Sequence, residues 1–364
     1  MLKGVKVIDF TNYLPGPFAT LRLAEMGAEI IKVEPPEGDP ARNTGISKQG
    51  DGLVFLANNR QKKSITLNLK EKEGVETAHK LIANADVVLE SFRPGVMEKL
   101  GLGYEAVQKV KPDIVYCSIS GYGQKGLLSK LGNHDINYMA LSGVLAQFKD
   151  QAGKPVHPSI TVADYLGGYA ANERILAGLV SRALTGKGSY HSISITDQLV
   201  SLLGNHVMVE KETGAGNGIN VLNGSIVSYA LYETMDGRYM SIGALEPKFW
   251  DNFCKANGRE EWCQAHFSKT DEFNPVFQEI TALFKNRTFS EWIDFTQKVD
   301  CCMAPVLEVG ELEDHPFFQE KELIFTSSWG DCQVKMHSDL NKESMTPPPK
   351  LNEHKDEILN NTVI

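Results

Sequence analysis

The beginning of the chain alternates between strand-like and helix-like patterns, and this alternation restricts the fold more than any other feature. Residues 5–10 form a short, largely apolar stretch, as in a buried strand. After Leu14-Pro15-Gly16-Pro17, a helix is expected over 18–26, because Pro17 suits the first helical position. Residues 29–33 again form an apolar strand. Strand, helix and strand in so short a span predict a βαβ unit with parallel strands.

The same alternation continues to about residue 200. The sequence therefore predicts a large α/β domain over residues 1–200, with a Rossmann-like, doubly wound parallel sheet. The other elements expected in it are helices at 75–84, 96–100, 104–110 and 136–145, a long helix that ends near 184, and strands at 86–90, 114–119 and 190–195.

A second domain is predicted beyond a linker. Residues 201–224 are interpreted as this linker, because their second half is rich in glycine and asparagine. Strands at 226–233 and 238–242 flank Asp236-Gly237, which is a hairpin signal, and helices are expected to begin near residues 244, 275 and 290. These features predict a smaller α+β domain over 225–315. In the segment 316–364, three consecutive prolines require 346–351 to lie extended on a surface.

Several functional classes are disfavoured by the sequence. The turn at 11–17 lacks the G-x-G-x-x-G pattern, so neither NAD nor FAD is expected. The net charge of −9 argues against nucleic-acid binding. No apolar run approaches the roughly 18 residues of a membrane span, and no signal peptide precedes the first strand, so a cytoplasmic protein is expected. Six cysteines without CxxC spacing argue against a metal site or a disulfide framework.

A histidine and an aspartate, His134-Asp135, open the apolar run that begins at Ile136. An imidazole exchanges protons near neutral pH, and the free N–H groups at a helix start attract anions. A single histidine before a helix is more often structural. The pair becomes a candidate for proton transfer only when other motifs support it.

Such support comes from a resemblance to the class III CoA-transferase superfamily, also called the CaiB/BaiF family. It runs almost from end to end and rests on residues 27–34, 93–96, 120–123, 134–138, 163–164, 185–188 and 244–247. The blocks around His134 and Leu245-Glu246-Pro247 resemble the α-methylacyl-CoA racemase branch of this superfamily.

The resemblance implies a two-base proton transfer at the α-carbon of a 2-methylacyl-CoA thioester. By this resemblance, His134 and Asp164 match the two bases of the racemase branch. Glu246 matches the carboxylate that hydrogen-bonds the histidine. The backbone N–H of Asp135 matches the hydrogen-bond donor to the thioester oxygen. The Asp135 side chain is expected to cap its own helix. Outside this context, Asp164 is better explained as a helix N-cap, and Glu246 as a surface helix start.

The same resemblance implies a set of substrate contacts. It expects CoA contacts at Thr66, Leu67, Asn68, Leu69, Arg42 and Arg93, and acyl-CoA contacts at Asn133, Ile136, Asn137 and Tyr138. A basic cluster at 60–63 precedes the first of these. The chain departs from the pattern at Pro35, where an arginine is common near the adenine, and at Asn133, where a glycine is common.

The resemblance also implies an interlocked homodimer whose large domain is completed by residues 330–364. The acyl-CoA is the substrate, and no metal or redox cofactor is implied. Two alternatives remain. One is a CoA-transferase that uses Asp164 as a nucleophile to move CoA between carboxylic acids. The other is a non-catalytic CoA-binding protein, in which replacing His134 and Asp164 leaves every turnover unchanged.

Overall fold

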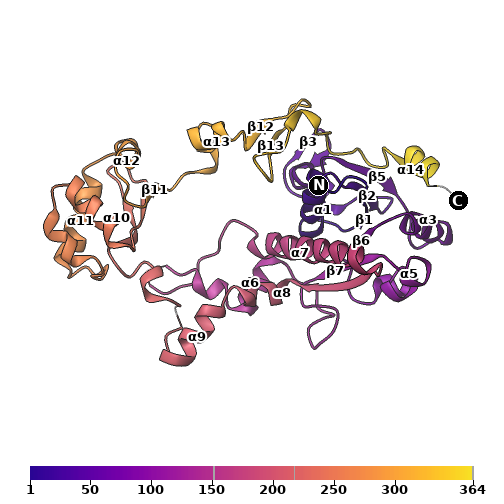
Figure 1. Cartoon of the computed structure of the whole chain (residues 1–364), viewed down its shortest axis with the longest axis horizontal. Helices are drawn as coiled ribbons and strands as arrows, with labels where there is room; N and C mark the ends of the chain where they lie inside the picture. The colour runs from indigo at the N-terminus through magenta and orange to yellow at the C-terminus, as the bar shows by residue number, and fades with distance from the viewer. Residues whose placement is uncertain (151, 217, 363–364) are drawn as a thin grey trace. The chain divides into compact units, whose positions relative to one another are not determined.

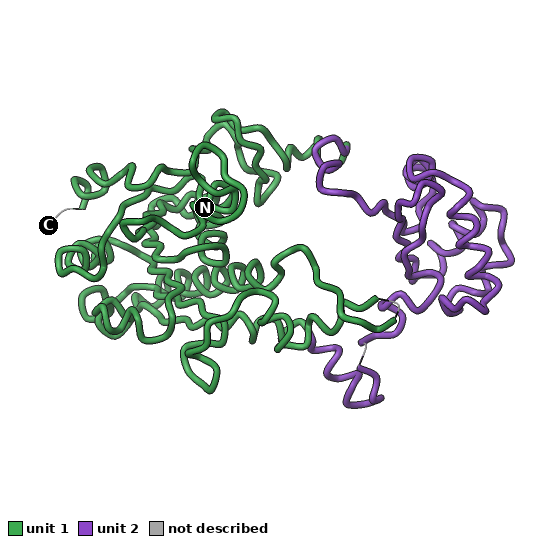
Figure 2. The backbone as a smooth tube through the Cα atoms, turned by 180° about the vertical axis from the view of Figure 1, so that it is seen from behind, with its two compact units in different colours: residues 1–202, 316–364 green, residues 203–315 purple. Residues whose placement is uncertain are grey.

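The computed structural model describes residues 1–150, 152–216 and 218–362. These residues form two compact units, which are coloured separately in Figure 2. Unit 1 comprises residues 1–202 with 316–364, and unit 2 comprises residues 203–315. The segment 201–224, expected to be a linker, contains the helix α9 (Gly204–Thr213) and a 3-10 helix at Asn220–Leu222. The connection is therefore partly helical.

Unit 1 is built on a six-stranded sheet in which each neighbouring pair of strands is parallel. In the order β5-β2-β1-β6-β7-β8, the strands are Lys62–Thr66, Glu29–Glu34, Lys6–Phe10, Val87–Glu90, Val115–Ser120 and Ser189–Ser194. The chain starts in the middle, builds outward to β5, and then returns beside β1 to build the other half. This is the order of the doubly wound fold. The predicted Rossmann-like parallel sheet is confirmed.

Helices cover both faces of this sheet (Figure 1). On one face, α1 (Pro15–Glu25) packs against α7 (Val162–Thr185), and both contact strands. On the other face, alternate strand residues such as Ile8 and Val88 share one apolar core with helices. These helices are α3 (Lys72–Ala83), α4 (Val96–Lys99), α5 (Tyr104–Val110) and α14 (Lys355–Asn361). The central strands β1, β6 and β7 are largely apolar because both of their faces are buried, whereas the outer strands β5 and β8 are more polar.

The start of α1 differs from the expectation. The helix begins at Pro15, so the predicted start with Pro17 in the first helical position was wrong. A proline is tolerated at the first position because the N–H that it lacks has no partner within the helix. Gly16 is required by close packing, because a Cβ there would lie 2.2 Å from the Cβ of Thr11. The end of β1 and the start of α1 therefore press closely together.

The long helix α7 approaches α1 through a glycine. A Cβ at Gly168 would lie 2.7 Å from both the Phe18 ring and the carbonyl oxygen of Pro15. Tyr165 and Tyr169, one turn apart on α7, contact the Phe18 ring edge-on. Among the residues that the structure describes, no helix combines the length and the apolar character needed to cross a membrane.

The other elements of unit 1 are shorter. They are β3 (Ser47–Lys48), β4 (Asp51–Gly52), α2 (Leu53–Asn58), α6 (Asp135–Ser142), α8 (Ile195–Ser201), α13 (Pro316–Glu320), β12 (Ile324–Thr326) and β13 (Cys332–Val334). The helix expected at 136–145 is shorter than predicted, because Gly143 ends α6 in the left-handed conformation. Helices α6, α7 and α8 pack against one another, which brings their first turns together.

Unit 2 is a small α+β unit, as predicted. Its antiparallel sheet has the order β11-β10-β9, with strands at Met303–Pro305, Tyr239–Gly243 and Tyr229–Glu233. The helices α10 (Pro247–Ala256), α11 (Pro275–Lys285) and α12 (Phe289–Thr296) pack on it. Their core is aromatic, and Trp250, Phe284 and Trp292 are fully buried.

The C-terminal segment returns to unit 1. As predicted, residues 346–350 are not helical, and the carbonyl oxygen of Thr346 accepts a hydrogen bond from Gln61. Asn352 and His354 then bond to the backbone of β5, the outermost strand. Ile358 of α14 enters the core. The two ends of the chain therefore build one unit together.

Candidate active site

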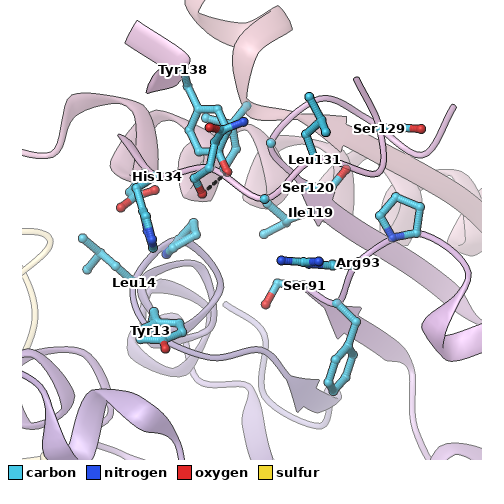
Figure 3. Close-up of a pocket in the computed structure, with 18 of the residues that line it drawn as sticks. Tyr13, Leu14, Ser91, Arg93, Ile119, Ser120, Ser129, Leu131, His134 and Tyr138 are labelled. Atoms are coloured by element: carbon cyan, nitrogen blue, oxygen red, sulfur yellow. Dashed lines mark hydrogen bonds between the residues drawn. The ribbon is translucent and has the colours of Figure 1, made fainter. Parts of the chain in front are cut away.

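A cavity of about 560 Å³ opens at the carboxyl edge of the parallel sheet. Loops after β1, β6 and β7 line it, together with the first turns of α6 and α7 (Figure 3). Parallel sheets bind ligands at this edge, beside the point where the strand order reverses, here between β1 and β6. Of the predicted site residues, the cavity wall contains Arg93, Asn133, His134, Tyr138 and Asp164.

His134 is the N-cap of α6 and lies at the helix start that the sequence predicted for the His134-Asp135 pair. Its backbone is extended, with φ −125° and ψ 173°, and its N–H donates to Oδ1 of Asn137 at 3.1 Å. Asn137 is exposed and lies outside the cavity wall. Its hydrogen bond to His134 holds the start of α6, and its predicted substrate contact stays a prediction. In Figure 3 the His134 ring points toward Leu14 across the cavity.

Asp164 lies inside α7, in the first turn, whereas the sequence placed it before the helix. Thr161 is the N-cap. The Asp164 carboxyl accepts no hydrogen bond from any residue in the described ranges. Burial and the neighbouring charge of Asp135 raise its pKa from the ordinary 3.8 to about 7. The side chain thus gains or loses a proton near neutral pH.

Asp135 caps a different helix from the one expected. Its Oδ1 accepts a hydrogen bond of 3.0 Å from the backbone N–H of Asp164, in α7. The prediction that it caps its own helix was wrong, because His134 already occupies the N-cap position and Asp135 is the first residue of α6. Its own N–H has no partner within the helix, which leaves that donor for a ligand.

Tyr138 and Asn133 form one wall of the cavity. The Tyr138 hydroxyl donates to the carbonyl oxygen of Asn133 at 2.7 Å, shown dashed in Figure 3, and the Asn133 amide donates to the hydroxyl of Tyr122 at 2.9 Å. A glycine makes room for this arrangement, because a Cβ at Gly121 would lie 2.2 Å from the Tyr138 ring. Asp135 and Ile136 instead line another cavity of about 510 Å³, beside His157, and His134 belongs to the walls of both cavities.

Arg93 supplies a positive charge to the cavity. Its guanidinium projects between Ser91 and Ile119 in Figure 3, and it forms no ion pair with any residue that the structure describes. Gly132 leaves the space for it, because a Cβ there would lie 2.6 Å from Nη2. An unpaired arginine beside a cavity is suited to bind a phosphate or carboxylate.

Several wall residues were missed by the sequence reasoning. Tyr13, Ser91 and Phe92 follow parallel strands, Ser120 is the last residue of β7, and all four line the cavity. The Ser120 hydroxyl is buried without a hydrogen-bond partner among the described residues. The signal that could have found them is positional, because side chains just beyond the carboxyl ends of β1, β6 and β7 must meet at one edge.

A second cavity of about 340 Å³ adjoins the first, and Phe92 belongs to both walls. The predicted residues Leu67, Asn68 and Leu69 line it, and so does Pro35. Thr66 lies outside this wall, and its N–H donates to the Asn352 side chain at 2.9 Å, so its predicted CoA contact stays a prediction.

Arg42 is not placed to bind a phosphate. Its guanidinium is buried and makes two hydrogen bonds to Glu34, at 2.7 and 2.8 Å, and one to Asp51 at 2.9 Å. It also lies over the Phe55 ring. Arg42 therefore does not replace the positive charge that an arginine at the position of Pro35 would bring near the adenine.

The cations of the basic cluster at 60–63 are also engaged within unit 1, and Arg60 and Lys62 are buried there. Arg60 is buried against Glu25, Lys62 is buried against Pro17 and Asn59, and Lys63 pairs with Glu29 and Glu357. These cations support the sheet edge and leave no basic patch for a ligand.

A buried ionic cluster supports the loop after β1. Lys32 is fully buried, and its Nζ lies 2.8 Å from Oδ2 of Asp39 and 2.8 Å from the carbonyl oxygen of Thr11. Oδ1 of Asp39 accepts the N–H of Tyr13 at 3.0 Å. Burial acts to lower the pKa of Lys32, but Asp9 and Asp39 outweigh it and raise that pKa. The cluster holds Tyr13 at the cavity in the left-handed region, at φ 63°.

Glu246 lies in unit 2, as the N-cap of α10. It is exposed, and its carboxylate neither caps the helix nor forms an ion pair with any described residue. Its predicted pairing with His134 stays a prediction.

Known proteins resemble the chain over its whole length. The sequence model of CoA-transferase family III matches residues 2–355. Human alpha-methylacyl-CoA racemase is 32% identical over 98% of this chain and 92% of its own length, and human succinyl-CoA:glutarate CoA-transferase is 31% identical over 98% and 85%. The crystal structure of a CaiB/BaiF family protein from Brucella suis aligns with a TM-score of 0.86 at 27% identity, over 100% of this chain and 99% of that one. The chain belongs to CoA-transferase family III, in which it is similar both to a racemase and to a CoA-transferase.

Proposed function

We propose that this protein is a racemase that inverts the α-carbon of a 2-methylacyl-CoA thioester. The observation that carries the proposal is that His134 and Asp164 line one cavity. Inversion requires the removal of a proton from one face of the carbon and the return of a proton to the other. Two acid–base groups of different chemistry, at the starts of neighbouring helices, suit this task.

The proton transfer runs through an enolate. The imidazole of His134 takes the α-proton, and the electron pair of the C–H bond moves toward the thioester oxygen. The carboxyl of Asp164 then delivers its proton to the opposite face, and the roles exchange in the reverse direction. A pKa of about 7 suits Asp164 to both roles near neutrality.

The enolate oxygen needs a hydrogen-bond donor, and the backbone N–H of Asp135 is proposed for it. This group is the first N–H of α6, and it has no acceptor within the helix. Helix N-termini stabilise negative charge. A fixed donor of this kind typically contributes about 3 kcal/mol to an oxyanion transition state.

The adjoining cavity is proposed to receive the nucleotide end of CoA. Its walls at Pro35, Leu67 and Leu69 are apolar, as a purine ring requires, while Asn68 offers amide hydrogen bonds. Arg93 stands near the junction at Phe92, where it is suited to meet a phosphate. The substrate would then extend from this cavity toward His134 and Asp164.

Glu246 and an interlocked homodimer complete the proposal. The carboxylate of Glu246 is exposed and forms no ion pair with any residue in the described ranges, so it is suited to accept a hydrogen bond from a histidine, which would fix the tautomer of His134. We propose that one subunit supplies Glu246 to the His134 of the other. Glu246→Gln is then expected to lower kcat, and monomers obtained by dilution are expected to be inactive.

The test is incubation of a single epimer of a 2-methylacyl-CoA in deuterated water without an acceptor acid. Racemisation is expected, with one deuterium incorporated at the α-carbon. His134→Gln and Asp164→Asn should each reduce it by about 10²–10⁴-fold. His79→Gln, on α3 at the opposite face of the sheet, is the matched control and should remain active. Retention of the original epimer without deuterium would contradict the proposal.

A CoA-transferase is the second candidate, and the 31% identity to a succinyl-CoA:glutarate CoA-transferase favours it. In this reaction the Asp164 carboxylate attacks the thioester carbonyl, which forms a mixed anhydride and releases the CoA thiolate. The step needs no base at His134. Transfer of CoA to an added carboxylic acid, unaffected by His134→Gln, would support this candidate against the racemase.

A further inference from the structure

The carboxylate of Asp135 joins the two helix starts that carry the proton-transfer side chains. Asp135 follows His134 directly, and its Oδ1 accepts the N–H of Asp164 at 3.0 Å. The N–H of Ala163 bonds to the same carboxylate. One side chain thus connects the immediate neighbourhoods of both groups, although residues 143–161 separate α6 from α7 along the chain.

We infer that Asp135 is a positioning residue whose carboxylate sets the separation of His134 from Asp164 and whose charge keeps the resting proton on Asp164. The inference rests on the proposed function, because it assigns the starting acid and base within that site. It adds a side-chain role to a residue whose proposed part in the reaction is a backbone N–H.

The positioning follows from the needs of the α7 N-terminus. The first N–H groups of a helix have no partners within it, and the N-cap Thr161 makes no side-chain hydrogen bond to them. Asp135 supplies the missing acceptor from the neighbouring helix, and its negative charge also suits the positive end of the helix dipole. Sliding of α6 along α7 would break these bonds, so His134 and Asp164 are held together.

The charged and titratable groups around Asp164 come from several elements. They are His134, Asp135 and Tyr138 from α6, Tyr165 from α7, Tyr13 from the loop after β1, and Arg93 from the loop after β6. Helix α8 contributes the apolar Ile195 to the wall, and its Asp197 is exposed. Burial is the largest cause of the raised pKa of Asp164, and the negative charge of Asp135 is the second.

The two carboxyl groups are unequal. Burial raises the pKa of Asp135 as well, but hydrogen bonds from two backbone N–H groups and the nearby charge of His157 oppose the rise. Asp164 has no such donor among the described residues, and its pKa reaches about 7. The negative charge of the pair therefore resides on Asp135. Asp164 begins as the acid, which leaves His134 as the first base.

Asp135→Asn separates charge from geometry, because its amide oxygen can still accept the N–H of Asp164. Titration of the Asp164 carboxyl by ¹³C NMR, with labelled aspartate and assignment by Asp164→Asn, is expected to show a midpoint lowered by about one pH unit. The alkaline limb of kcat/KM, where Asp164 loses the proton that it must deliver, should move in the same direction while KM changes little. Asp197→Asn, on α8, is the matched control and should leave the midpoint unchanged.

Asp135→Ala removes both the charge and the acceptor, and kcat should fall further than in Asp135→Asn, on the order of 100-fold. Circular dichroism verifies that each variant is folded, and Asp135→Asn alone still decides the matter if the alanine variant unfolds. An unchanged Asp164 midpoint in Asp135→Asn overturns the inference. A lowered midpoint in a protein that does not racemise acyl-CoA contradicts the proposed function instead, and leaves the link between the two carboxyl groups standing.

Discussion

Replacing Asp164 with asparagine should make the protein more stable at neutral pH while it greatly slows racemisation. The carboxyl is held partly buried beside Asp135, where ionisation is costly. In the unfolded chain the same carboxyl ionises in water at its ordinary pKa. An amide of similar shape never ionises, so Asp164→Asn removes that cost from the folded state.

The magnitude follows from the shift in pKa. Between the ordinary 3.8 and about 7, the folded state holds a proton that the unfolded state has released. The stability of the native protein therefore falls as pH rises through this interval. A difference of about three units corresponds to about 4 kcal/mol, and water in the open cavity reduces this to about 2–4 kcal/mol. Asp164→Asn should regain this amount between pH 4 and pH 8.

The assay is thermal unfolding of both proteins from pH 4 to pH 8. For a unit of this size, the melting temperature of Asp164→Asn should rise relative to the wild type by roughly 5–15 °C across the range. Asp236→Asn is a control of opposite sign. Hydrogen bonds from Thr234 and from the Phe289 N–H lower the pKa of Asp236. The stability that the ionised Asp236 gives the wild type relative to Asp236→Asn should therefore be lost as pH falls. A pH-independent difference between wild type and Asp164→Asn would refute the reasoning.

Three further predictions concern the architecture of the site. Gly121→Ala places a methyl group 2.2 Å from the Tyr138 ring, which should destabilise the fold by about 1–3 kcal/mol and reduce turnover, as thermal melts and kinetics can measure. Lys32→Met leaves Asp39 buried without its cation, which should cost about 3–5 kcal/mol in denaturant unfolding. Arg93→Ala should raise KM for acyl-CoA by at least about tenfold, because a charge-assisted hydrogen bond contributes about 1.5–3 kcal/mol, while the melting temperature stays unchanged.

Matched variants make these predictions specific. Gly310→Ala, where a Cβ meets no atom within 4 Å, should be tolerated. Arg42→Ala should lower stability, in contrast to Arg93→Ala, because Arg42 is buried against Glu34 and Asp51. A melting temperature that Arg42→Ala leaves unchanged would contradict the structural role given to that residue. Equal effects of Arg42→Ala and Arg93→Ala on KM would contradict the division of roles between them.

Much of the fold was predictable because its signals are local. The helix at Tyr104–Val110 begins and ends where the sequence placed it, and the helix Pro275–Lys285 begins where it was expected. Apolar strands that alternate with helices imply a parallel sheet, because such strands must be buried on both faces. The error at the start of α1 came from two prolines close together, either of which suits the first turn of a helix.

The charged residues were predicted less well, because a partner in space leaves no trace in the neighbouring sequence. Arg42 and Arg93 look alike as isolated cations, yet Arg42 is buried against carboxylates and Arg93 faces a cavity. The partner of Arg60 is Glu25, and the two lie on different elements. Charge patterning along the chain therefore cannot separate a structural ion pair from a binding site.

The sequence by itself determined the layered α/β architecture, the family, and the presence of a histidine at a helix start. Hydrophobic periodicity and turn chemistry act over a few residues, which is why these features can be read in order along the chain. Only the tertiary structure decided that the Asp135 carboxylate accepts a hydrogen bond from the first turn of α7 and that Asp164 shares a cavity with His134. Both depend on the packing of α6 against α7. Burial and a nearby charge, which set the proton affinity of Asp164, exist only once that packing has formed.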